Sequence, residues 1–595
     1  MVFAGELRKQ IIRIIDRRKE TDDMGYMENC RKWLESETVD EKTRQEIQAL
    51  TDCPEELRSR FDSMLTFGTA GLRGVMRAGL NGMNIYTVRY ATQGLANVIL
   101  SCGENIGGGV TIAHDCRNNS RLFACEAASV LMANNIHVYL FEDMRPTPEL
   151  SFAIRETHSI AGINITASHN TKEFNGYKAY WSDGAQLPPE HADRVSEEMA
   201  KLDIFEDVRL ADLEEAASGG LLTIIGEEMD EKYMSHVLAQ SLGKEYVQKV
   251  PDDFEIVFTP FHGTGYRLVP EVLKRLGMKH VVPVPEQMVP DGNFPTVQSP
   301  NPENIEGFRL ATKLAEERQC DLIIGTDPDA DRCGVVVRNG ETYEALTGNR
   351  IGVLLLDYLI TMRKAKGMLP ANAAAVKSIV TTPMANAIGA ANGVAVIDVY
   401  TGFKFIGEKM KEYETTGEHT FIFGFEESIG FLAGTYARDK DAVVAAMLVA
   451  EMACYYRCHE MNLVQALQAL YEKYGFYKEQ TISVTYEGFD SGKRMAARME
   501  SLRESYPKEM GLPVRRVRDY KVSAIYDSTT GESEPTGMEP ADVLFFELAD
   551  NCNLAIRPSG TEPKIKVYVM AQGESAEAAE RNLVCIREAI LARMK

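Results

Sequence analysis

The segment IAGINITASHNTKEFNG, residues 160–176, changes from apolar to polar within a few positions. Residues 160–165 predict a short buried strand, because they form a continuous apolar run of strand length. Residues 170–176 predict a turn. Ser168 therefore lies at a strand-to-loop junction, where a rigid edge can hold a hydroxyl toward a cleft. Since most loop serines are solvated or cap a turn, Ser168 becomes a candidate only together with other segments.

Apolar runs of strand length alternate with helix-like periodic segments through most of the chain, which predicts repeated βαβ units with mixed or mainly parallel sheets. The predicted strands include residues 109–113, 137–141, 254–259, 321–325, 376–380, 394–399 and 420–424. The predicted helices between them include residues 122–134, 270–276, 350–363 and 403–413. After about residue 463 the pattern changes to strands at 480–486, 541–548, 553–556 and 565–571 and a helix at 576–593.

Polar, turn-rich stretches divide the chain into four predicted domains of α/β class. The first three are expected to be mixed α/β sheets with helices, and the fourth a smaller α+β domain. The predicted boundaries are 1–210, 211–338, 339–462 and 463–595. The first 60 or so residues predict charged helices ahead of the first sheet.

Composition restricts the class of protein. The chain has 595 residues, 45% of them hydrophobic and 26% charged, as in ordinary globular proteins. The net charge of −22 argues against nucleic acid or an anionic membrane as a partner. No apolar run approaches the ~20 residues of a membrane span, and the first residues lack the apolar core of a signal peptide. Eleven cysteines without a CxxC pair indicate a reducing compartment, so we expect a cytoplasmic protein.

The segment GTDPDADR, residues 325–332, follows a predicted buried strand and carries Asp327, Asp329 and Asp331. Three carboxylates at alternate positions, on a loop stiffened by proline, can converge on one hard cation such as Mg²⁺. An EF-hand calcium loop would need glycine and glutamate where Arg332 and Arg338 stand. A solvated acidic turn is the alternative, but Arg332 places a phosphate ligand beside the candidate metal ligands.

Two later loops carry groups suited to a phosphorylated sugar. GFEESIG, residues 424–430, presents Glu426 and Ser428 and suits sugar hydroxyls, although alone it could be an ordinary exposed turn. RPSGTEPK, residues 557–564, combines Arg557 and Lys564 with hydroxyls and backbone N–H groups that can cradle phosphate oxygens. It lacks a Walker-type GK[ST] pattern, and a decorated hairpin is its alternative.

Smaller basic segments fit the same chemistry. FGTAGLRG, residues 67–74, is a glycine-rich loop with Arg73. TGFK, residues 401–404, starts a predicted helix with Lys404, where the helix N-terminus already favours anions. RDKD, residues 438–441, supplies Lys440 close to the GFEESIG loop. Each of these alone is more often structural than functional.

Taken together, the segments resemble the phosphoglucomutase/phosphomannomutase family, the α-D-phosphohexomutases. TASHN, DPDADR, GFEES and RPSGTEPK occur in the family's order along nearly the whole chain, and FGTAGLRG, PTPEL, FHGTG and PNPEN add to the match. The forms FGTAGLRG and GFEESIG resemble the branch that contains phosphoglucomutase 2, phosphopentomutase-like enzymes and many bacterial phosphoglucomutases. The resemblance implies four domains around one central cleft, each contributing a loop.

Matching motif to motif, the resemblance implies a role for each candidate residue. Ser168 would be the phosphoserine, and its phosphate would hold Mg²⁺ together with Asp327, Asp329 and Asp331. Glu426 and Ser428 would bind sugar hydroxyls, and the substrate's non-reacting phosphate would be held by Arg557, Ser559, Gly560 and Thr561. Proton transfer or charge stabilisation would fall to His169 and Lys440, with supporting basic groups from Arg73, Arg332 and Lys404.

The implied activity is that of an intramolecular phosphotransferase of the isomerase class. It would interconvert glucose 1-phosphate and glucose 6-phosphate through a phosphoserine and a glucose 1,6-bisphosphate intermediate, acting on small sugar phosphates as a monomer or weak homodimer. Mannose and pentose phosphates are alternative substrates, because no single motif distinguishes these sugars. A metal-dependent sugar phosphatase is the rival enzyme class, although a metal pair with histidine ligands is not evident. A catalytically inactive sugar-phosphate sensor is disfavoured by the intact Ser168 and aspartates.

Overall fold

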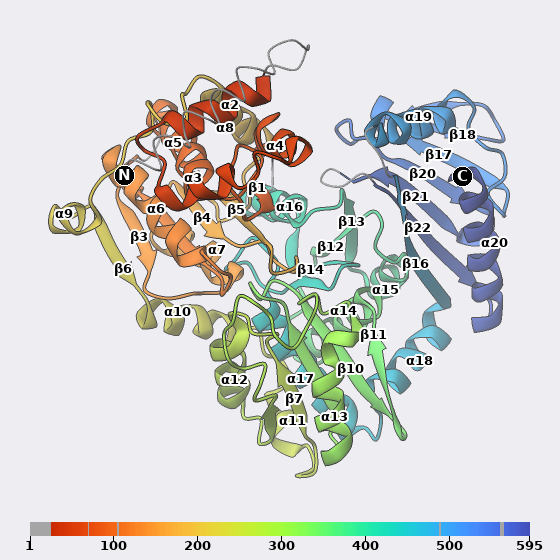
Figure 1. Ribbon diagram of the computed structural model, residues 1–595. Coiled ribbons are helices and arrows are strands. Elements are labelled where there is room, and N and C mark those ends of the chain that lie inside the picture. The colour runs from red at the N-terminus through yellow and green to blue at the C-terminus, as the bar shows by residue number, and fades with distance from the viewer. Residues whose placement is uncertain (1–24, 69–70, 104–105, 487–489, 560–563, 595) are drawn as a thin grey trace. The chain divides into compact units, whose positions relative to one another are not determined.

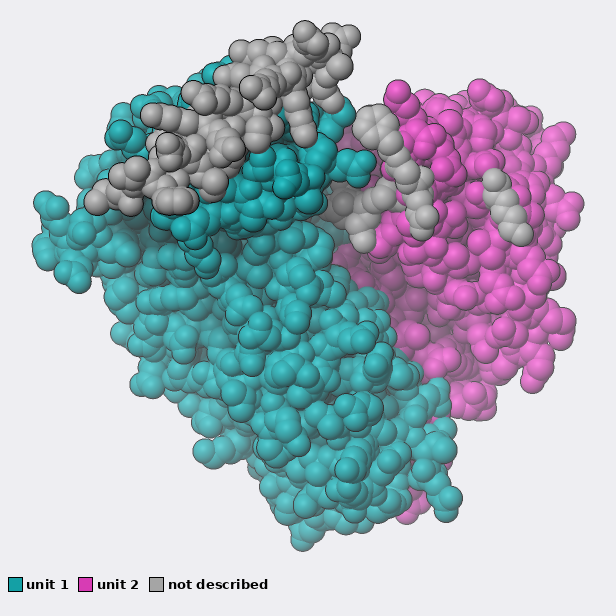
Figure 2. Space-filling view, in the orientation of Figure 1, with its two compact units in different colours: residues 1–346, 402–424, 429–459 teal, residues 347–401, 425–428, 460–595 magenta. Residues whose placement is uncertain are grey.

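A computed structural model describes residues 25–68, 71–103, 106–486, 490–559 and 564–594 (Figure 1). The chain divides into two compact units, each made of three separate segments of the sequence (Figure 2). Unit 1 comprises residues 1–346, 402–424 and 429–459, and unit 2 comprises residues 347–401, 425–428 and 460–595. Strands of the described residues form four sheets.

The first sheet of unit 1 has six strands in the order β1-β5-β4-β2-β3-β6. Strands β2, β3, β4 and β6 run parallel, β5 pairs antiparallel with β4, and β1 pairs antiparallel with β5 at the edge of the sheet. The strands are β1 (Leu72–Val75), β2 (Val110–His114), β3 (Val138–Phe141), β4 (Ala161–Ile165), β5 (Phe174–Trp181) and β6 (Leu222–Ile225). This sheet extends past the predicted boundary at residue 210, because β6 pairs with β3.

Helices pack around the first sheet and complete one large apolar core. In that core Trp33 packs edge-on against Phe61, Tyr86 and Phe205, which ties the N-terminal helices to the domain. The helices are α2 (Gly25–Glu35), α3 (Glu41–Gln48), α4 (Pro54–Phe61), α5 (Ile85–Cys102), α6 (Ser120–Ala133), α7 (Thr147–Glu156), α8 (Pro189–Ala200) and α9 (Leu213–Ser218). The predicted charged helices within the first 60 residues are thus confirmed over the described part.

The second sheet of unit 1 has five strands in the order β11-β10-β9-β7-β8. Strands β7 and β9 are parallel, whereas β9, β10 and β11 form an antiparallel meander. The strands are β7 (Ile256–Thr259), β8 (Val281–Pro283), β9 (Leu322–Thr326), β10 (Cys333–Asn339) and β11 (Thr342–Leu346). Unit 1 also contains α10 (Glu227–Leu238), α11 (Lys244–Lys249), α12 (Gly265–Leu276), α13 (Arg309–Arg318), α16 (Phe403–Thr416), β15 (Gly430–Leu432) and α17 (Ala442–Cys458).

Unit 2 contains a parallel strand pair, β12 (Ala373–Ser378) and β13 (Ala395–Val399), with α14 (Gly348–Ala365) and α15 (Met384–Asn392). Strand β14 (Thr420–Glu426) begins in unit 1 and ends in unit 2. Helix α18 (Leu463–Tyr474) leads into the last sheet. Thr347 caps α14 by accepting from the Arg350 N–H, which explains why that helix begins at Gly348.

The last sheet has seven strands in the order β16-β22-β21-β20-β17-β18-β19, and every pair is antiparallel. Helices α19 and α20 cover one face, and their apolar residues complete a separate core (Figure 1). The elements are β16 (Phe476–Thr485), α19 (Ser491–Glu504), β17 (Val514–Asp519), β18 (Ala524–Asp527), β19 (Ser533–Pro535), β20 (Leu544–Leu548), β21 (Asn553–Pro558), β22 (Lys564–Gly573) and α20 (Ala576–Met594). The predicted α/β class with a smaller α+β last domain is therefore confirmed.

One predicted element is wrong in part. Residues 170–176 were expected to form a turn, but β5 already begins at Phe174. Gly176 permits this, because a Cβ there would lie 2.5 Å from the carbonyl oxygen of Thr166 and 2.9 Å from that of Leu72. The close approach lets β5 pair with both β1 and β4.

Candidate active site

Ser168 stands in the loop that follows β4, with its side chain almost fully buried. Its φ of 53° is left-handed, a conformation that non-glycine residues adopt rarely and that clusters at functional sites. Two hydrogen bonds support the loop: the Ser168 N–H donates to Thr166 Oγ1 at 2.8 Å, and Thr166 Oγ1 donates to Asp115 Oδ2 at 2.7 Å. These bonds fix the backbone conformation from which the serine hydroxyl is presented.

Arg117 is the main clamp of the Ser168 loop. Its guanidinium donates to the carbonyl oxygens of Ser168 at 2.6 Å and Asn170 at 2.5 Å, and to those of Thr171 at 2.9 Å and Phe174 at 3.0 Å. These are charge-assisted hydrogen bonds in a buried setting, where each is worth more than a neutral one. One side chain therefore holds the loop from the serine to the start of β5.

Asp327 brings the β9–β10 hairpin to the serine. Its Oδ2 accepts from Ser168 Oγ at 3.0 Å, and its Oδ1 accepts from the N–H groups of Asp331 and Arg332, both at 3.0 Å. Ala330 has a φ of 49°, which folds the loop back on itself. The two sequence motifs predicted to act together, TASHN and DPDADR, are thus joined within unit 1.

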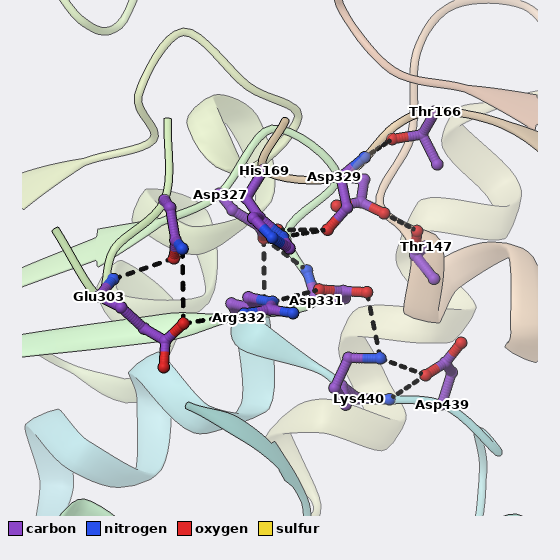
Figure 3. A network of polar contacts seen from close by, with 12 residues as sticks. Thr147, Thr166, His169, Glu303, Asp327, Asp329, Asp331, Arg332, Asp439 and Lys440 are labelled. Atoms are coloured by element: carbon purple, nitrogen blue, oxygen red, sulfur yellow. Dashed lines mark hydrogen bonds and ion pairs between the residues drawn. The ribbon is translucent and has the colours of Figure 1, made fainter. Parts of the chain in front are cut away.

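Two buried lysines face the other aspartates. Lys178 Nζ lies 2.7 Å from Asp329 Oδ2 and 3.2 Å from Asp331 Oδ2. Lys440 Nζ lies 3.2 Å from Asp331 Oδ2 and 2.8 Å from Asp439 Oδ1. Figure 3 shows Asp331 between Arg332 and Lys440. The predicted residue Lys440 therefore belongs to the same cluster as the carboxylates.

The three aspartates fit a divalent cation. Each offers one carboxylate oxygen, and these oxygens lie within 4.8 Å of one another in a buried site. Asp329 Oδ1 and Asp331 Oδ1 are buried and form no hydrogen bond with any described residue. Because unsatisfied buried carboxylate oxygens are costly, this donor set could hold a metal ion.

The pKa values of Asp327 and Asp331 are shifted in opposite directions. Burial raises the pKa of Asp327 well above its usual range, and the neighbouring Asp329 and Asp331 raise it further. Burial would also raise the pKa of Asp331, but Lys440, Lys178 and Arg332 more than offset this and hold it below its usual range. Without a cation the cluster therefore favours a protonated Asp327 beside an ionised Asp331.

His169 faces the serine as a neutral base. Its Nδ1 lies 3.2 Å from Ser168 Oγ. Burial lowers the pKa of His169 well below its usual range, and Arg332 and Arg73 lower it further. Arg73 also donates to Asn170 Oδ1 at 3.1 Å, so the basic residue of the glycine-rich loop reaches the serine loop. Burial and the neighbouring cations thus favour the uncharged imidazole beside the serine hydroxyl.

The remaining predicted residues lie elsewhere in the chain. Lys404 begins α16 in unit 1, where burial lowers its pKa. Glu426 is buried and Ser428 half-buried in unit 2, and Arg557 donates to the Tyr568 hydroxyl at 3.1 Å in the same unit. The Ser559 N–H donates to the Lys564 carbonyl at 2.8 Å. Gly560 and Thr561 lie outside the described residues.

Sequence reasoning missed two important residues. Lys178 pairs with two of the aspartates, and the signal was a lysine in the otherwise apolar run of β5, YKAYW. Arg117, three residues after the end of β2, was given no role from the sequence, yet it clamps the serine loop. A charged residue in a strand that is buried on both faces must have a partner, and that rule would have identified Lys178.

Comparison with known proteins agrees with this geometry. Four family models, described as phosphoglucomutase/phosphomannomutase α/β/α domains I, II and III and C-terminal domain, match residues 64–204, 231–340, 347–474 and 514–586. The chain belongs to the phosphoglucomutase/phosphomannomutase family. It is therefore an enzyme of the phosphohexomutase type, in the isomerase class.

Curated relatives of the family cover most of the chain. A phosphoglucomutase from Staphylococcus saprophyticus is 34% identical over 534 residues, 89% of this chain and 94% of that protein. A phosphoglucomutase from Staphylococcus aureus is 36% identical over 523 residues, 86% of this chain and 91% of that protein.

Solved structures of the family share the fold. A phosphoglucomutase/phosphomannomutase family protein from Burkholderia thailandensis matches with a TM-score of 0.64 at 17% identity, covering 89% of this chain and 97% of that one. Parafusin from Paramecium matches with a TM-score of 0.64 at 18% identity, covering 90% of this chain and 96% of that one. Among the described helices of our protein, none has the length and apolar character needed to cross a bilayer.

Proposed function

We propose that the protein is a phosphoglucomutase that interconverts glucose 1-phosphate and glucose 6-phosphate through phospho-Ser168 and a glucose 1,6-bisphosphate intermediate. The observation that carries this proposal is the 3.0 Å contact between Ser168 Oγ and Asp327, at the edge of a carboxylate cluster flanked by Lys178 and Lys440. Phosphoryl transfer depends mostly on positioning and on neutralising negative charge, and the cluster supplies both.

The aspartates and a phosphorylated Ser168 are proposed to hold Mg²⁺. Asp327, Asp329 and Asp331 would contribute carboxylate oxygens, two of which otherwise lack a hydrogen bond to any described residue. When bound, the ion would neutralise charge on the transferring phosphoryl oxygens. Lys178 and Lys440 would keep the cluster ordered and offset its remaining charge.

The protein groups around Ser168 have separate proposed roles in the two transfers. In the first, a substrate hydroxyl attacks phospho-Ser168, the bond from phosphorus to Ser168 Oγ breaks, and the bisphosphate forms while the hydroxyl proton passes through His169 to the departing Ser168 Oγ. In the second, Ser168 Oγ attacks the other phosphate of the bisphosphate, the bond from that phosphorus to the sugar oxygen breaks, and the serine proton passes through His169 to the departing sugar oxygen. Lys440 and Arg332 stabilise negative charge, and Arg73 steadies the loop through Asn170.

The unit 2 residues are proposed to recognise the sugar and its second phosphate. Glu426 and Ser428 would bind sugar hydroxyls, because carboxylate and hydroxyl groups suit them. The non-reacting phosphate would be held by Arg557, Ser559, Gly560 and Thr561, with Lys404 in support. The bisphosphate must be accepted in two orientations, since each of its phosphates in turn lies at Ser168. The predicted domain boundaries, the cytoplasmic location and a monomer or weak homodimer belong to the same proposal.

The test is ³¹P NMR of glucose 1-phosphate with the full chain, Mg²⁺ and a trace of glucose 1,6-bisphosphate, alongside Ser168→Ala. We expect conversion to glucose 6-phosphate that the variant loses. If glucose 1-phosphate is unchanged while mannose or pentose phosphate isomerises, the reaction class stands and the sugar is wrong. Steady release of inorganic phosphate instead would overturn the mutase in favour of a phosphatase.

A further inference from the structure

A cavity of about 410 Å³ lies within unit 2, and every residue that lines it belongs to that unit. One wall comes from β12, β13 and α15, with Lys377, Asp398 and Asn386. The other wall comes from the seven-stranded sheet. The volume falls in the range of small-molecule sites.

The sheet wall of this cavity is the face opposite α19 and α20, and no helix of the described residues covers it. Phe545 and Glu547 of β20 line the cavity, whereas Leu544 and Phe546 point to the core under α19 and α20. The cavity also stands apart from the proposed phosphate loop. Asn553, which lines it, begins β21, while Arg557 is near the other end of that strand.

The charges in the cavity favour an anion. Lys377 Nζ is paired with Asp398 Oδ1 at 2.8 Å, and Arg518 Nε donates to Glu547 Oε1 at 2.6 Å. Arg515 is exposed, and its side chain contacts no partner among the described residues. Three cations therefore face two carboxylates, and one guanidinium remains for a phosphate.

The rest of the lining suits a polyhydroxylated ring. Asn386, Asn553 and Gln572 offer side-chain amides that can both donate to and accept from hydroxyl groups. Asp398 keeps 43% of its side chain exposed, so a carboxylate oxygen is accessible too. Phe545 also lines the cavity, with the Arg518 guanidinium 5.7 Å from the centre of its ring, so a sugar that packs here would contact Phe545 and Arg518 together.

We propose that this cavity is a second sugar-phosphate site, separate from the proposed substrate site. The phosphate would bind at Arg515, the hydroxyl groups at the amides and Asp398, and the ring against Phe545. Nothing in this assignment requires Ser168 or the phosphate loop, so it goes beyond the proposed reaction.

The cavity is also connected to the loop that presents Glu426 and Ser428. Lys377 Nζ donates to the Thr381 carbonyl at 3.1 Å, and both residues line the cavity. Thr381 Oγ1 accepts from the Glu427 N–H at 3.1 Å and donates to Glu427 Oε2 at 3.3 Å. An occupant that shifts Lys377 or Thr381 would therefore change the position of the sugar-binding loop, which makes the cavity a regulatory site.

The test is isothermal titration calorimetry of glucose 6-phosphate into the full chain carrying Ser168→Ala, which prevents turnover. We expect two bound equivalents. Adding Arg515→Ala should weaken glucose 6-phosphate binding at the cavity at least tenfold, so that this equivalent is no longer detected. Adding Arg557→Ala instead should abolish binding at the proposed substrate site. The matched control is Arg581→Ala, an exposed arginine of α20 on the opposite face of the sheet, which should change neither.

The outcomes separate this site from the proposed function. If Arg557→Ala changes nothing but Arg515→Ala removes the bound sugar phosphate, the cavity stands and the substrate site fails. If Arg515→Ala leaves every bound equivalent in place, or if no glucose 6-phosphate binds, the cavity proposal is overturned. Inorganic phosphate binding as tightly as glucose 6-phosphate would also overturn it, since the sugar would then contribute nothing.

Hydrogen exchange tests the connection to the sugar loop. In the Ser168→Ala, Arg557→Ala background only the cavity should fill, and glucose 6-phosphate should slow exchange of the Glu427 amide severalfold. The same ligand should have no effect once Arg515→Ala is added. Unchanged exchange despite saturated binding would refute the regulatory connection.

Discussion

Lys178 stands at the centre of the charge balance around Ser168. It is buried in β5 and contacts both Asp329 and Asp331, so it neutralises carboxylates that no solvent reaches. Removing one partner of a buried ion pair leaves the other charge uncompensated, which is more costly than losing a surface pair. Loss of Lys178 should therefore destabilise the folded protein whether or not the enzyme is turning over substrate.

Lys178→Met should lower the free energy of unfolding by about 3–5 kcal/mol in metal-free protein. Mg²⁺ should restore part of this loss, because a bound cation would take over the charge of the lysine. Urea unfolding with EDTA and with Mg²⁺ measures both effects. Lys172→Met, at an exposed lysine in the loop before β5, is the control. A variant as stable as wild type without metal would contradict the assigned charge balance.

Glu149 gives a pH-dependent prediction at the same scale. It is fully buried in α7, with Arg145 Nε at 4.0 Å and no hydrogen bond to its carboxyl from any described residue. Burial raises the pKa of Glu149 well above its unfolded value of 4.5, and Asp230 raises it further. A carboxyl with a raised pKa binds its proton more tightly when folded, so its stabilisation is full below pH 4.5 and is lost as the pH rises.

The free energy of unfolding of Glu149→Gln should therefore rise relative to that of wild type as the pH increases above 4.5, by about 1.4 kcal/mol per pH unit. Urea unfolding of both proteins between pH 4 and pH 7 measures the difference. Glu156→Gln, at the exposed end of the same helix, should show no such slope. A constant difference across this range would mean that Glu149 is ionised in the folded protein.

At the scale of elements, the loop between β9 and β10, which carries the three aspartates, is held by a close backbone contact from the FHGTG segment, residues 261–265. A Cβ at Gly263 would lie 2.4 Å from Pro328 Cα, and the Thr264 N–H donates to the Pro328 carbonyl at 2.8 Å. Gly263 thus sets the position of the loop that carries the three aspartates. Its role is visible only from the packing of two loops that are far apart in sequence.

Gly263→Ala should push Pro328 away and weaken Mg²⁺ binding by about tenfold or more, as expected for a change that displaces metal ligands indirectly. The measurement is calorimetric titration of Mg²⁺ into metal-free protein. Gly107→Ala, where a Cβ meets nothing within 4 Å, is the matched control. Equal Mg²⁺ affinity in the two variants would show that the contact does not set the loop.

Sequence patterns predicted some elements and could not predict others, for physical reasons. Strand β4 was identifiable because its residues are all buried and, apart from Asn164, not polar. Strand β1 was not, because its LRGV sequence sits in a glycine-rich segment and gains its order from pairing with β5. The aspartates could be proposed from their spacing, whereas the partners of Lys178 come from a separate sheet and depend on tertiary structure.

At the scale of the whole molecule, the last sheet of unit 2 and the whole of unit 1 are assembled from the chain in different ways. The last sheet and its core use only residues from Phe476 to Met594, a continuous stretch. Unit 1 instead needs residues 402–424 and 429–459 in addition to its first 346. Asp441 illustrates this, because it caps α17 and accepts from the Tyr233 hydroxyl at 2.8 Å.

A fragment of residues 475–595 should therefore fold alone, with a cooperative urea transition and a dispersed amide NMR spectrum. A fragment of residues 1–346 should not reach the native state, since it lacks α17 and Lys440 and leaves α12 without its packing partner. A cooperative transition for residues 1–346 equal to that of the full chain would contradict this division.

Mass spectrometry can decide whether Ser168 carries the phosphoryl group. The full chain is incubated with glucose 1,6-bisphosphate and Mg²⁺, desalted, and analysed intact and after proteolysis. We expect one added phosphoryl group, located on Ser168 and removed again by glucose 6-phosphate. A protein that remains unphosphorylated, or that carries the group on another residue, would contradict it.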